Sequence, residues 1–260
     1  MLDFATMNST KINPDRLMEH VLSTYHTLRY GMVIITLLYP VVIYLAGAFS
    51  GEGLKGSLSD YYWSDAAGAE PYLPRTLFIG GLFAIAGFMY LYKGYTFKEN
   101  VALNSAALLA IGVALVPTSH GEWDPGYWHG GFAVAMFLCL VYVVWFRARD
   151  TLDLHPAESG DGPATKRYSR AWYQAQYSTL GTVMLLSPVT AAILELTVGD
   201  KSYVFFIEAA GIWAFGGYWL AKSWELQRLA KERSLMASAV TTKSPELHVV
   251  EAARSQAMNA

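Results

Sequence analysis

The sequence predicts an all-α fold: a polytopic membrane helix bundle of about six transmembrane helices with the N- and C-termini in the cytoplasm. Three observations predict this class: long apolar stretches, few charged residues, and an uneven distribution of lysine and arginine. Each stretch is close to the ~20 residues that a helix needs to cross ~30 Å of hydrocarbon. The six stretches are Tyr30–Phe49, Thr76–Tyr95, Val101–Pro117, Trp128–Phe146, Tyr177–Leu196 and Tyr203–Ala221.

Composition and charge support both the class and the orientation. Hydrophobic residues make up 53% of the chain and charged residues 15%, which is typical of a bundle in lipid and not of a soluble domain. Sixteen of the 19 lysine and arginine residues fall in the segments on the side of the chain ends, and the other side holds only Lys55, Arg75 and Lys201. Because cytoplasmic segments are enriched in Lys and Arg, both termini are predicted to be cytoplasmic.

The first residues, 1–12, are expected to be disordered. A helix is predicted to begin next, with Asn13 as its N-cap and Pro14 at its first helical position. This segment, Pro14–Arg29, has apolar residues largely on one side, so we expect an amphipathic helix in the cytoplasmic interface before the first span. The membrane domain is then expected to cover residues 13–226.

The C-terminal tail, residues 227–260, is expected to begin as a charged helix and to end as a disordered Ser/Thr/Ala-rich stretch. The chain has one cysteine, Cys139, which excludes an intramolecular disulfide and a cysteine metal cluster. Basic residues are spread over four segments, as orientation alone requires, so no nucleic-acid partner is expected. The expected partners are the lipid bilayer, a lipid or amphiphile substrate, and a membrane-protein partner or a second copy.

Small residues recur on one stripe of two neighbouring stretches. They allow helix backbones to approach closely, so the second and third stretches are predicted to form a tightly packed antiparallel hairpin. The residues are Gly80, Gly81, Ala84 and Gly87 in the second stretch and Ala106, Ala110 and Ala114 in the third.

The residues that could carry chemistry gather on the extracytoplasmic side. The first outer loop contains Ser59 and Asp60, and the second contains His120 and, nine residues later, His129. Two imidazoles and a carboxylate from Asp60, Glu122 or Glu208 would suit zinc, with an open position for water. The alternative is that both histidines are interfacial hydrogen-bonding residues, and a pair at spacing nine does not decide between the two.

Glu208 is the most informative single residue. It lies about one and a half turns inside the sixth stretch, roughly 7 Å below the outer surface. Ionisable groups at such a depth are costly and usually face the bundle interior, a cavity or a partner. Glu195 is close enough to share a proton or a cation with it. The alternative is a structural ion pair between Glu208 and Arg75.

Four short runs resemble a set of bacterial multi-pass membrane proteins without an assigned activity. The resemblance covers about a quarter of the chain, around the second and third stretches, and it implies a bacterial inner-membrane protein. The runs are Ser57–Tyr62, Arg75–Gly80, Tyr92–Tyr95 and Asn104 through Thr118.

A looser resemblance is to the membrane hydrolases that include alkaline ceramidases and progestin/adiponectin receptors. Those proteins have seven spans and a zinc site of Ser, Asp and three His, of which Ser59, Asp60 and His120 could represent a part. The last stretches of this chain contain no histidine, so Glu195 or Glu208 would have to substitute.

Two function classes follow. The first is a metal-assisted hydrolase of the outer leaflet, with Ser59, Asp60 and Glu208 as catalytic residues and His120, His129 and Glu208 as zinc ligands. The second is a non-catalytic membrane subunit or small transporter with Glu208 as its ion or proton site. A third, weaker hypothesis is a b-type cytochrome with His120 and His129 as axial ligands.

Overall fold

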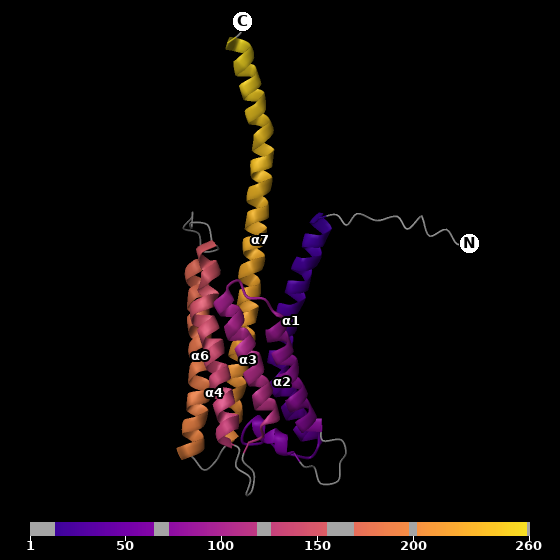
Figure 1. Cartoon of the computed structure of the whole chain (residues 1–260), viewed down its shortest axis with the longest axis vertical. Coiled ribbons are helices and arrows are strands. Elements are labelled where there is room, and N and C mark those ends of the chain that lie inside the picture. The colour runs from indigo at the N-terminus through magenta and orange to yellow at the C-terminus, as the bar shows by residue number, and fades with distance from the viewer. Residues whose placement is uncertain (1–13, 65–72, 119–125, 155–168, 198–201, 259–260) are drawn as a thin grey trace, which may run out of the picture.

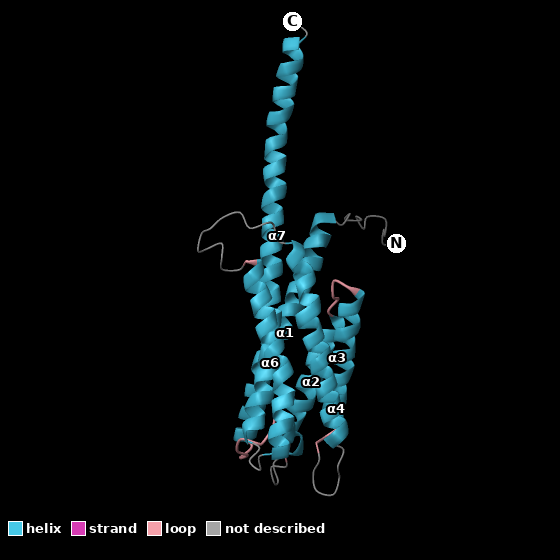
Figure 2. Ribbon diagram, turned by 90° about the vertical axis from the view of Figure 1, so that its left-hand side faces the viewer, coloured by secondary structure: helices cyan, strands magenta, loops and turns pink. Residues whose placement is uncertain are grey.

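The computed structural model describes residues 14–64, 73–118, 126–154, 169–197 and 202–258. This part of the chain is helical almost throughout and contains no β-strand (Figure 2). Long helices run side by side along one axis (Figure 1). They are α1 (Pro14–Phe49), α2 (Leu73–Leu91), α3 (Phe97–Leu115), α4 (Gly126–Tyr142), α6 (Arg170–Thr197) and α7 (Ser202–Met258), with short segments η2 (Ser59–Trp63), η3 (Val143–Arg147) and η4 (Ala148–Leu154).

The long helices close into a ring. Each packs against its neighbours in the chain, and α1 also packs against α7. α1 begins and α7 ends at the same end of the bundle (Figure 1). We call this the termini end, and we call the opposite end, where the α1–α2 connection lies, the cap end. A ring of antiparallel neighbours leaves a central axis that several helices can line together.

In the part of the chain that the structure describes, five helices are long and apolar enough to cross a membrane, which confirms a helical protein suited to the bilayer. α3 is not among the five. Its first turn carries Lys98 and Glu99, and five of its alanines are buried between other helices. A helix that meets protein on much of its surface needs less apolar character than one that faces lipid. The described residues therefore contain five candidate spans, and the expected sixth corresponds to α3, which has 19 residues as α2 does and lies in the same ring.

Both ends of the chain differ from the sequence-based expectation. A separate interfacial helix over Pro14–Arg29 is wrong, because α1 is one helix of 36 residues that runs through Arg29 and contains Pro40. Nothing between Arg29 and Tyr30 breaks a helix, and hydrophobicity alone does not mark a boundary there. α7 likewise continues to Met258, through the segment for which the sequence predicts disorder.

The small-residue hairpin is confirmed on one side and corrected on the other. Ala106, Ala110 and Ala114 are buried, and α3 packs against α2 as expected. On α2, however, a Cβ at Gly81 would overlap the ring of Tyr39 on α1, whereas a Cβ at Gly80 would meet open space. Gly81 therefore allows α2 to lie close to α1, and not to α3. The spacing of small residues predicts a close contact without identifying the neighbour.

The chain after α1 folds back over the cap end. The Phe205 backbone N–H donates to the carbonyl of Gly56 at 2.9 Å, which satisfies one of the unpaired N–H groups in the first turn of α7. The side chain of Tyr61 in η2 is completely buried, and Gly47 makes room for its ring. Trp63 Nε1 donates to the carbonyl of Thr118 at 3.0 Å. This segment, residues 50–64, is called the cap below.

Candidate functional site

A central cavity of about 80 Å³ lies inside the ring, beneath the cap. Its wall is mainly apolar, and the polar residues in it are Thr36, Tyr39, Ser59, His129 and Glu208. The apolar residues are Leu58, Phe78, Leu82, Ile85, Met89, Val113, Ala133, Met136, Phe137, Leu140, Ile212 and Phe215. The wall thus comes from the cap and from α1, α2, α3, α4 and α7.

Glu208 and His129 form the ionisable part of this wall. Glu208 Oε2 accepts a hydrogen bond from the Leu58 backbone N–H at 2.7 Å, so the carboxylate ties α7 to the cap. His129 is buried, and its Nδ1 lies 2.6 Å from the carbonyl of Val116. Because a carbonyl only accepts, Nδ1 carries the proton in this contact, which leaves Nε2 as the acceptor in a neutral ring.

The structure brings together some of the residues predicted for the site. Ser59, His129 and Glu208 line the same cavity. Asp60 has a different task, because its Oδ2 accepts from the Ser57 backbone N–H at 3.0 Å and stabilises the start of η2. His120 and Glu122 lie outside the described residues, and so does the side chain of Glu195.

Arg75 has a partner other than the expected Glu208. Its guanidinium donates to the Tyr62 hydroxyl at 2.9 Å and its Cζ lies 4.3 Å from the centre of the Tyr62 ring. The side chain therefore stabilises the cap through an aromatic contact and a hydrogen bond. The proposed ion pair with Glu208 gains no support from these contacts.

The described residues do not make up a zinc site. Within residues 14–64, 73–118, 126–154, 169–197 and 202–258, no group of three His, Cys, Asp or Glu side chains is placed to hold a metal ion. His129 and Glu208 supply two ligands at most, whereas catalytic zinc has three protein ligands. The third predicted ligand, His120, lies outside the described residues.

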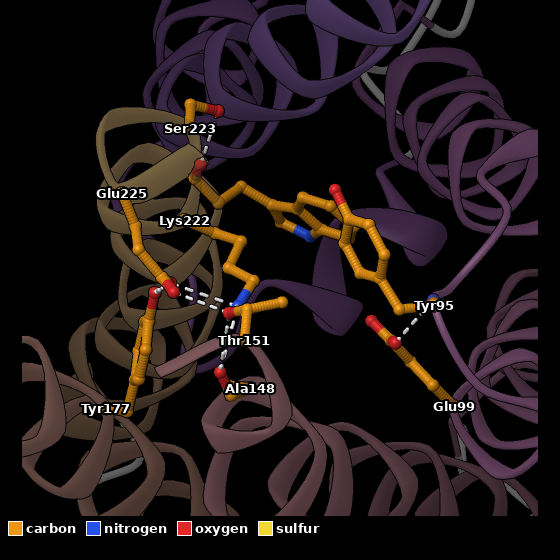
Figure 3. A network of polar contacts seen from close by, with 9 residues as sticks. Tyr95, Glu99, Ala148, Thr151, Tyr177, Lys222, Ser223 and Glu225 are labelled. Atoms are coloured by element: carbon orange, nitrogen blue, oxygen red, sulfur yellow. Dashed lines mark hydrogen bonds and ion pairs between the residues drawn. The ribbon is translucent and has the colours of Figure 1, made fainter. Parts of the chain in front are cut away.

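A second polar region, which we call the inner layer, contains Glu99, Ala148, Thr151, Tyr177, Lys222 and Glu225 (Figure 3). It lies toward the termini end, where α3 begins and α4 ends (Figure 1). Its centre is Lys222 of α7, whose side chain is 1% exposed. Lys222 Nζ donates to the carbonyl of Ala148 at 2.8 Å, to Thr151 Oγ1 at 2.5 Å and to Glu225 Oε2 at 3.0 Å. These three bonds use all three N–H groups of the ammonium, so its charge is fully solvated by protein.

Glu225 is equally well satisfied. Its side chain is 0% exposed. Besides the bond from Lys222, it accepts from Thr151 Oγ1 at 2.5 Å and from the Tyr177 hydroxyl of α6. The pair therefore joins α7 to α6 and to η4. The shared hydrogen bonds and the opposite charge offset the cost of burying each group, whereas either charge alone would be left uncompensated.

The chain after α4 supplies two of the acceptors for Lys222. The helix changes at Val143 into the π-helical segment η3 and then into the 3₁₀ segment η4. π-helical turns inside α-helices often occur at functional sites. Here the change leaves the carbonyl of Ala148 and the hydroxyl of Thr151 directed at Lys222.

Glu99 is a further buried acid of the inner layer, 1% exposed at the start of α3. Its Oε2 accepts from the Tyr95 N–H at 2.8 Å, while its own N–H donates to Thr96 Oγ1 at 3.2 Å. This reciprocal arrangement is close to a capping box. A Cβ at Gly94 would lie 2.6 Å from Glu99 Cγ, so glycine is required there. Burial raises the pKa of the Glu99 carboxyl above its ordinary value.

The inner layer is missing from the sequence-based prediction, because the last apolar stretch ends at Ala221 and Lys222 and Glu225 lie beyond it. Helical spacing could have identified them. Ile212 and Phe215 follow Glu208 at intervals of four and three residues, and Trp219 and Lys222 continue the same intervals. Residues at such intervals share one face of a helix. The Thr96–Glu99 spacing is also a recognisable helix start.

Comparison of the chain with protein-family models, with curated proteins and with solved structures finds no match. The residues and their geometry are therefore the basis for function.

Proposed function

We propose that this chain is an integral protein of the bacterial inner membrane that binds and carries a small amphiphile. The cationic end of the amphiphile, or a proton, would bind at Glu208. The observation that carries the proposal is that Glu208 and His129 line one largely apolar cavity inside the helix ring. An acid within a membrane helix is costly and usually marks a substrate or ion pathway.

The proposal includes six spans and cytoplasmic termini. The ring of six long helices in the described part, the placement of the start of α1 and the end of α7 at one end, and the basic residues of that side all support it. Reporter fusions after Gly68 and after Asp161 test it. We expect the first reporter outside and the second inside the cell, and two reporters in the same compartment would contradict the topology.

The size and lining of the cavity indicate the class of ligand. A cavity of about 80 Å³ exceeds the ~10–15 Å³ that one water needs but is far below the ~300–1,000 Å³ of drug-sized pockets. Its aromatic and aliphatic wall suits a short alkyl chain. Phe78, Phe137 and Phe215 are also part of the wall, and aromatic rings can attract a cation. A short-chain amine meets each of these conditions.

The cap provides a way for binding to open the cavity. Leu58 and Ser59 of the cap line the cavity, and Glu208 holds the cap by accepting from the Leu58 N–H. An ammonium group that binds to Glu208 competes with this N–H for the carboxylate. Binding of the ligand thus weakens the contact between α7 and the cap, as a carrier with alternating access requires.

A charge series of short ligands tests the proposal. Butylammonium, 1-butanol and butyrate have similar chains and carry a positive, a neutral and a negative end. We measure the shift in thermal unfolding midpoint that each causes for the protein in nanodiscs, because a ligand that binds the folded state stabilises it by mass action. The expected order is butylammonium, then butanol, then butyrate. Equal shifts for all three ligands would overturn the proposal.

Three variants separate charge from volume. Glu208→Gln keeps an acceptor for the Leu58 N–H and should lose the preference for the cation. Ala133→Leu fills the cavity and should weaken binding of all three ligands. Asp60→Asn is the matched control, because Asp60 binds the Ser57 N–H and is not part of the cavity wall. A cation preference that persists in Glu208→Gln would also contradict the proposal.

A metal-assisted hydrolase is the second candidate, and the placement of Ser59 on the same cavity as His129 favours it. It requires a third ligand, such as His120, from outside the described residues. Metal analysis of the purified protein separates the two functions. Stoichiometric zinc that is lost in both His120→Ala and His129→Ala would support the hydrolase and replace the carrier.

A further inference from the structure

The inner layer contains more buried polar groups than the Lys222–Glu225 pair can satisfy. Tyr218 and Trp219 of α7 are almost completely buried, and the Tyr218 hydroxyl and Trp219 Nε1 have no hydrogen-bond partner among the described residues. The buried Nε of Arg29 also has no hydrogen-bond partner among the described residues. Buried donors of this kind usually have a partner, so the layer has the capacity to bind a further polar group.

Glu99 is a buried acid close enough to Tyr218 to act on its hydroxyl. Among neighbouring charges it has the largest electrostatic effect on the Tyr218 hydroxyl, ahead of Glu225. Figure 3 shows its carboxylate pointing inward, toward the side of the bundle that holds Thr151 and Lys222. Lys222 already gives its three N–H groups to Ala148, Thr151 and Glu225. It therefore attracts Glu99 through space while its hydrogen bonds go elsewhere.

We propose that Glu99 is a proton-binding site, whose carboxyl takes up and releases a proton inside the inner layer. The proton binds to one carboxylate oxygen, and the group changes between a neutral acid and an anion. One oxygen, Oε2, is held by the Tyr95 N–H, so the protein fixes the orientation of the carboxyl in both states. A carboxylic acid that is kept neutral by its surroundings can donate a hydrogen bond that a carboxylate cannot.

Besides burial, charged groups on α7 and η4 act on this carboxyl. Lys222 of α7 favours its charged form, and Asp150 of η4 opposes it. Glu99 and Arg29 of α1 both act electrostatically on the hydroxyls of Tyr92 and Tyr95 in the α2–α3 turn. Burial raises the pKa of Glu99, and this is the largest of the effects on the group. A buried acid that shares its one cation with another carboxylate and has an acid nearby keeps its proton to a higher pH than an ordinary glutamate does.

The inference goes beyond the proposed function and does not depend on it. Glu99 and the cavity lie at different depths of the ring, since Glu99 begins α3 at the termini end and Glu208 lies beneath the cap. If both proposals hold, one face of α7 carries Glu208 at the ligand site and Lys222 next to the proton site. Such a connection is what a carrier needs to couple transport to a proton gradient.

Infrared difference spectroscopy of the full chain in nanodiscs tests the site without any knowledge of the substrate. A protonated carboxylic acid has a C=O stretching band that the carboxylate lacks. We expect a band of this kind that disappears as the pH is raised, at a pH above that of an ordinary glutamate, and that is absent from Glu99→Gln. The amide oxygen introduced by this substitution would still accept from the Tyr95 N–H, so the fold should be preserved.

The double variant Lys222→Met/Glu225→Gln is the control. It removes the ion pair without leaving a single buried charge, so it should keep the carboxylic acid band. A parent protein without a titrating band in this pH range would overturn the proposal. A band that survives in Glu99→Gln would also overturn it. If the double variant removes this surviving band, the proton belongs to Glu225. Unaltered ligand binding in Glu99→Gln would leave the carrier function intact, and the two proposals can therefore fail separately.

Discussion

Glu208 and Glu225 lie on the same helix, α7, yet their surroundings differ. Glu225 is completely buried and accepts from Lys222, Thr151 and Tyr177. Glu208 is half-buried, holds the N–H of Leu58 and faces an apolar cavity. Protein donors surround the first carboxylate on both oxygens, as expected for a structural ion pair. The second lies where a ligand can reach it, so position within the membrane domain does not by itself identify a functional acid.

The difference should be largest in stability. Replacing Lys222 alone with Met, or Glu225 alone with Gln, breaks the buried pair and should cost about 3–5 kcal/mol, because it leaves one charge or its partners unsatisfied. Glu208→Gln should cost less than about 1.5 kcal/mol, since the acceptor for Leu58 is kept. Unfolding of each purified variant in mixed micelles by denaturant measures these values.

The double variant Lys222→Met/Glu225→Gln sharpens this comparison. It should be more stable than either single variant, because no isolated charge remains buried. If the double variant loses the sum of the two single effects, the residues act independently and the ion pair is not the unit that holds α6, α7 and η4 together.

A second comparison concerns two adjacent glycines of α2. Gly81 lies against the ring of Tyr39, and Gly80 borders open space. Gly81→Leu should destabilise the protein by at least ~1–3 kcal/mol through overpacking between α1 and α2. Gly80→Leu should change the stability little. Thermal unfolding of both variants in one detergent checks the prediction, and equal midpoints would mean that the α1–α2 contact is not close.

Much of the architecture follows from the sequence, because apolar length and helical periodicity are local properties. All six apolar stretches lie largely on helices of the ring, and the depth of Glu208 in the last stretch is enough to single it out. The ends of α1 and α7 are not predicted well. Residues such as Leu17 and Leu22 suit an interfacial helix and an extension of a span equally, so composition cannot separate the two.

The contacts of the site are less predictable than its residues. Ser59, His129 and Glu208 meet because the cap folds onto α7 and α4, which requires the tertiary structure. Opposite charge and a shared outer position favour a pair between Arg75 and Glu208, but the structure gives Arg75 a contact with Tyr62. Charge and depth restrict the partners of a side chain to one layer of the membrane and do not select among them.

The raised pKa of Glu99 predicts that the free energy of unfolding depends on pH. Burial raises the pKa of Glu99 above 4.5, so the folded state keeps this proton at a pH where the unfolded state has lost it. Stability from this group is complete below about pH 4.5 and is lost as the pH rises through the folded pKa. Glu99→Gln should match the parent in acid and become relatively more stable as the pH rises. A constant difference between the two unfolding curves from acid to neutral pH would contradict this.

The smallest expected effect concerns Arg75. It decides whether this residue is coupled to Tyr62 or to Glu208. The hydrogen bond and ring contact with Tyr62 should couple the two residues by about 0.5–1 kcal/mol, the range for a cation over an aromatic ring at an accessible site. A double-mutant cycle of Arg75→Gln and Tyr62→Leu measures this coupling. The cycle of Arg75→Gln with Glu208→Gln should be additive within about 0.5 kcal/mol. Strong coupling to Glu208 and none to Tyr62 would restore the ion pair. Glu208 would then resemble Glu225, as an acid whose charge serves the fold.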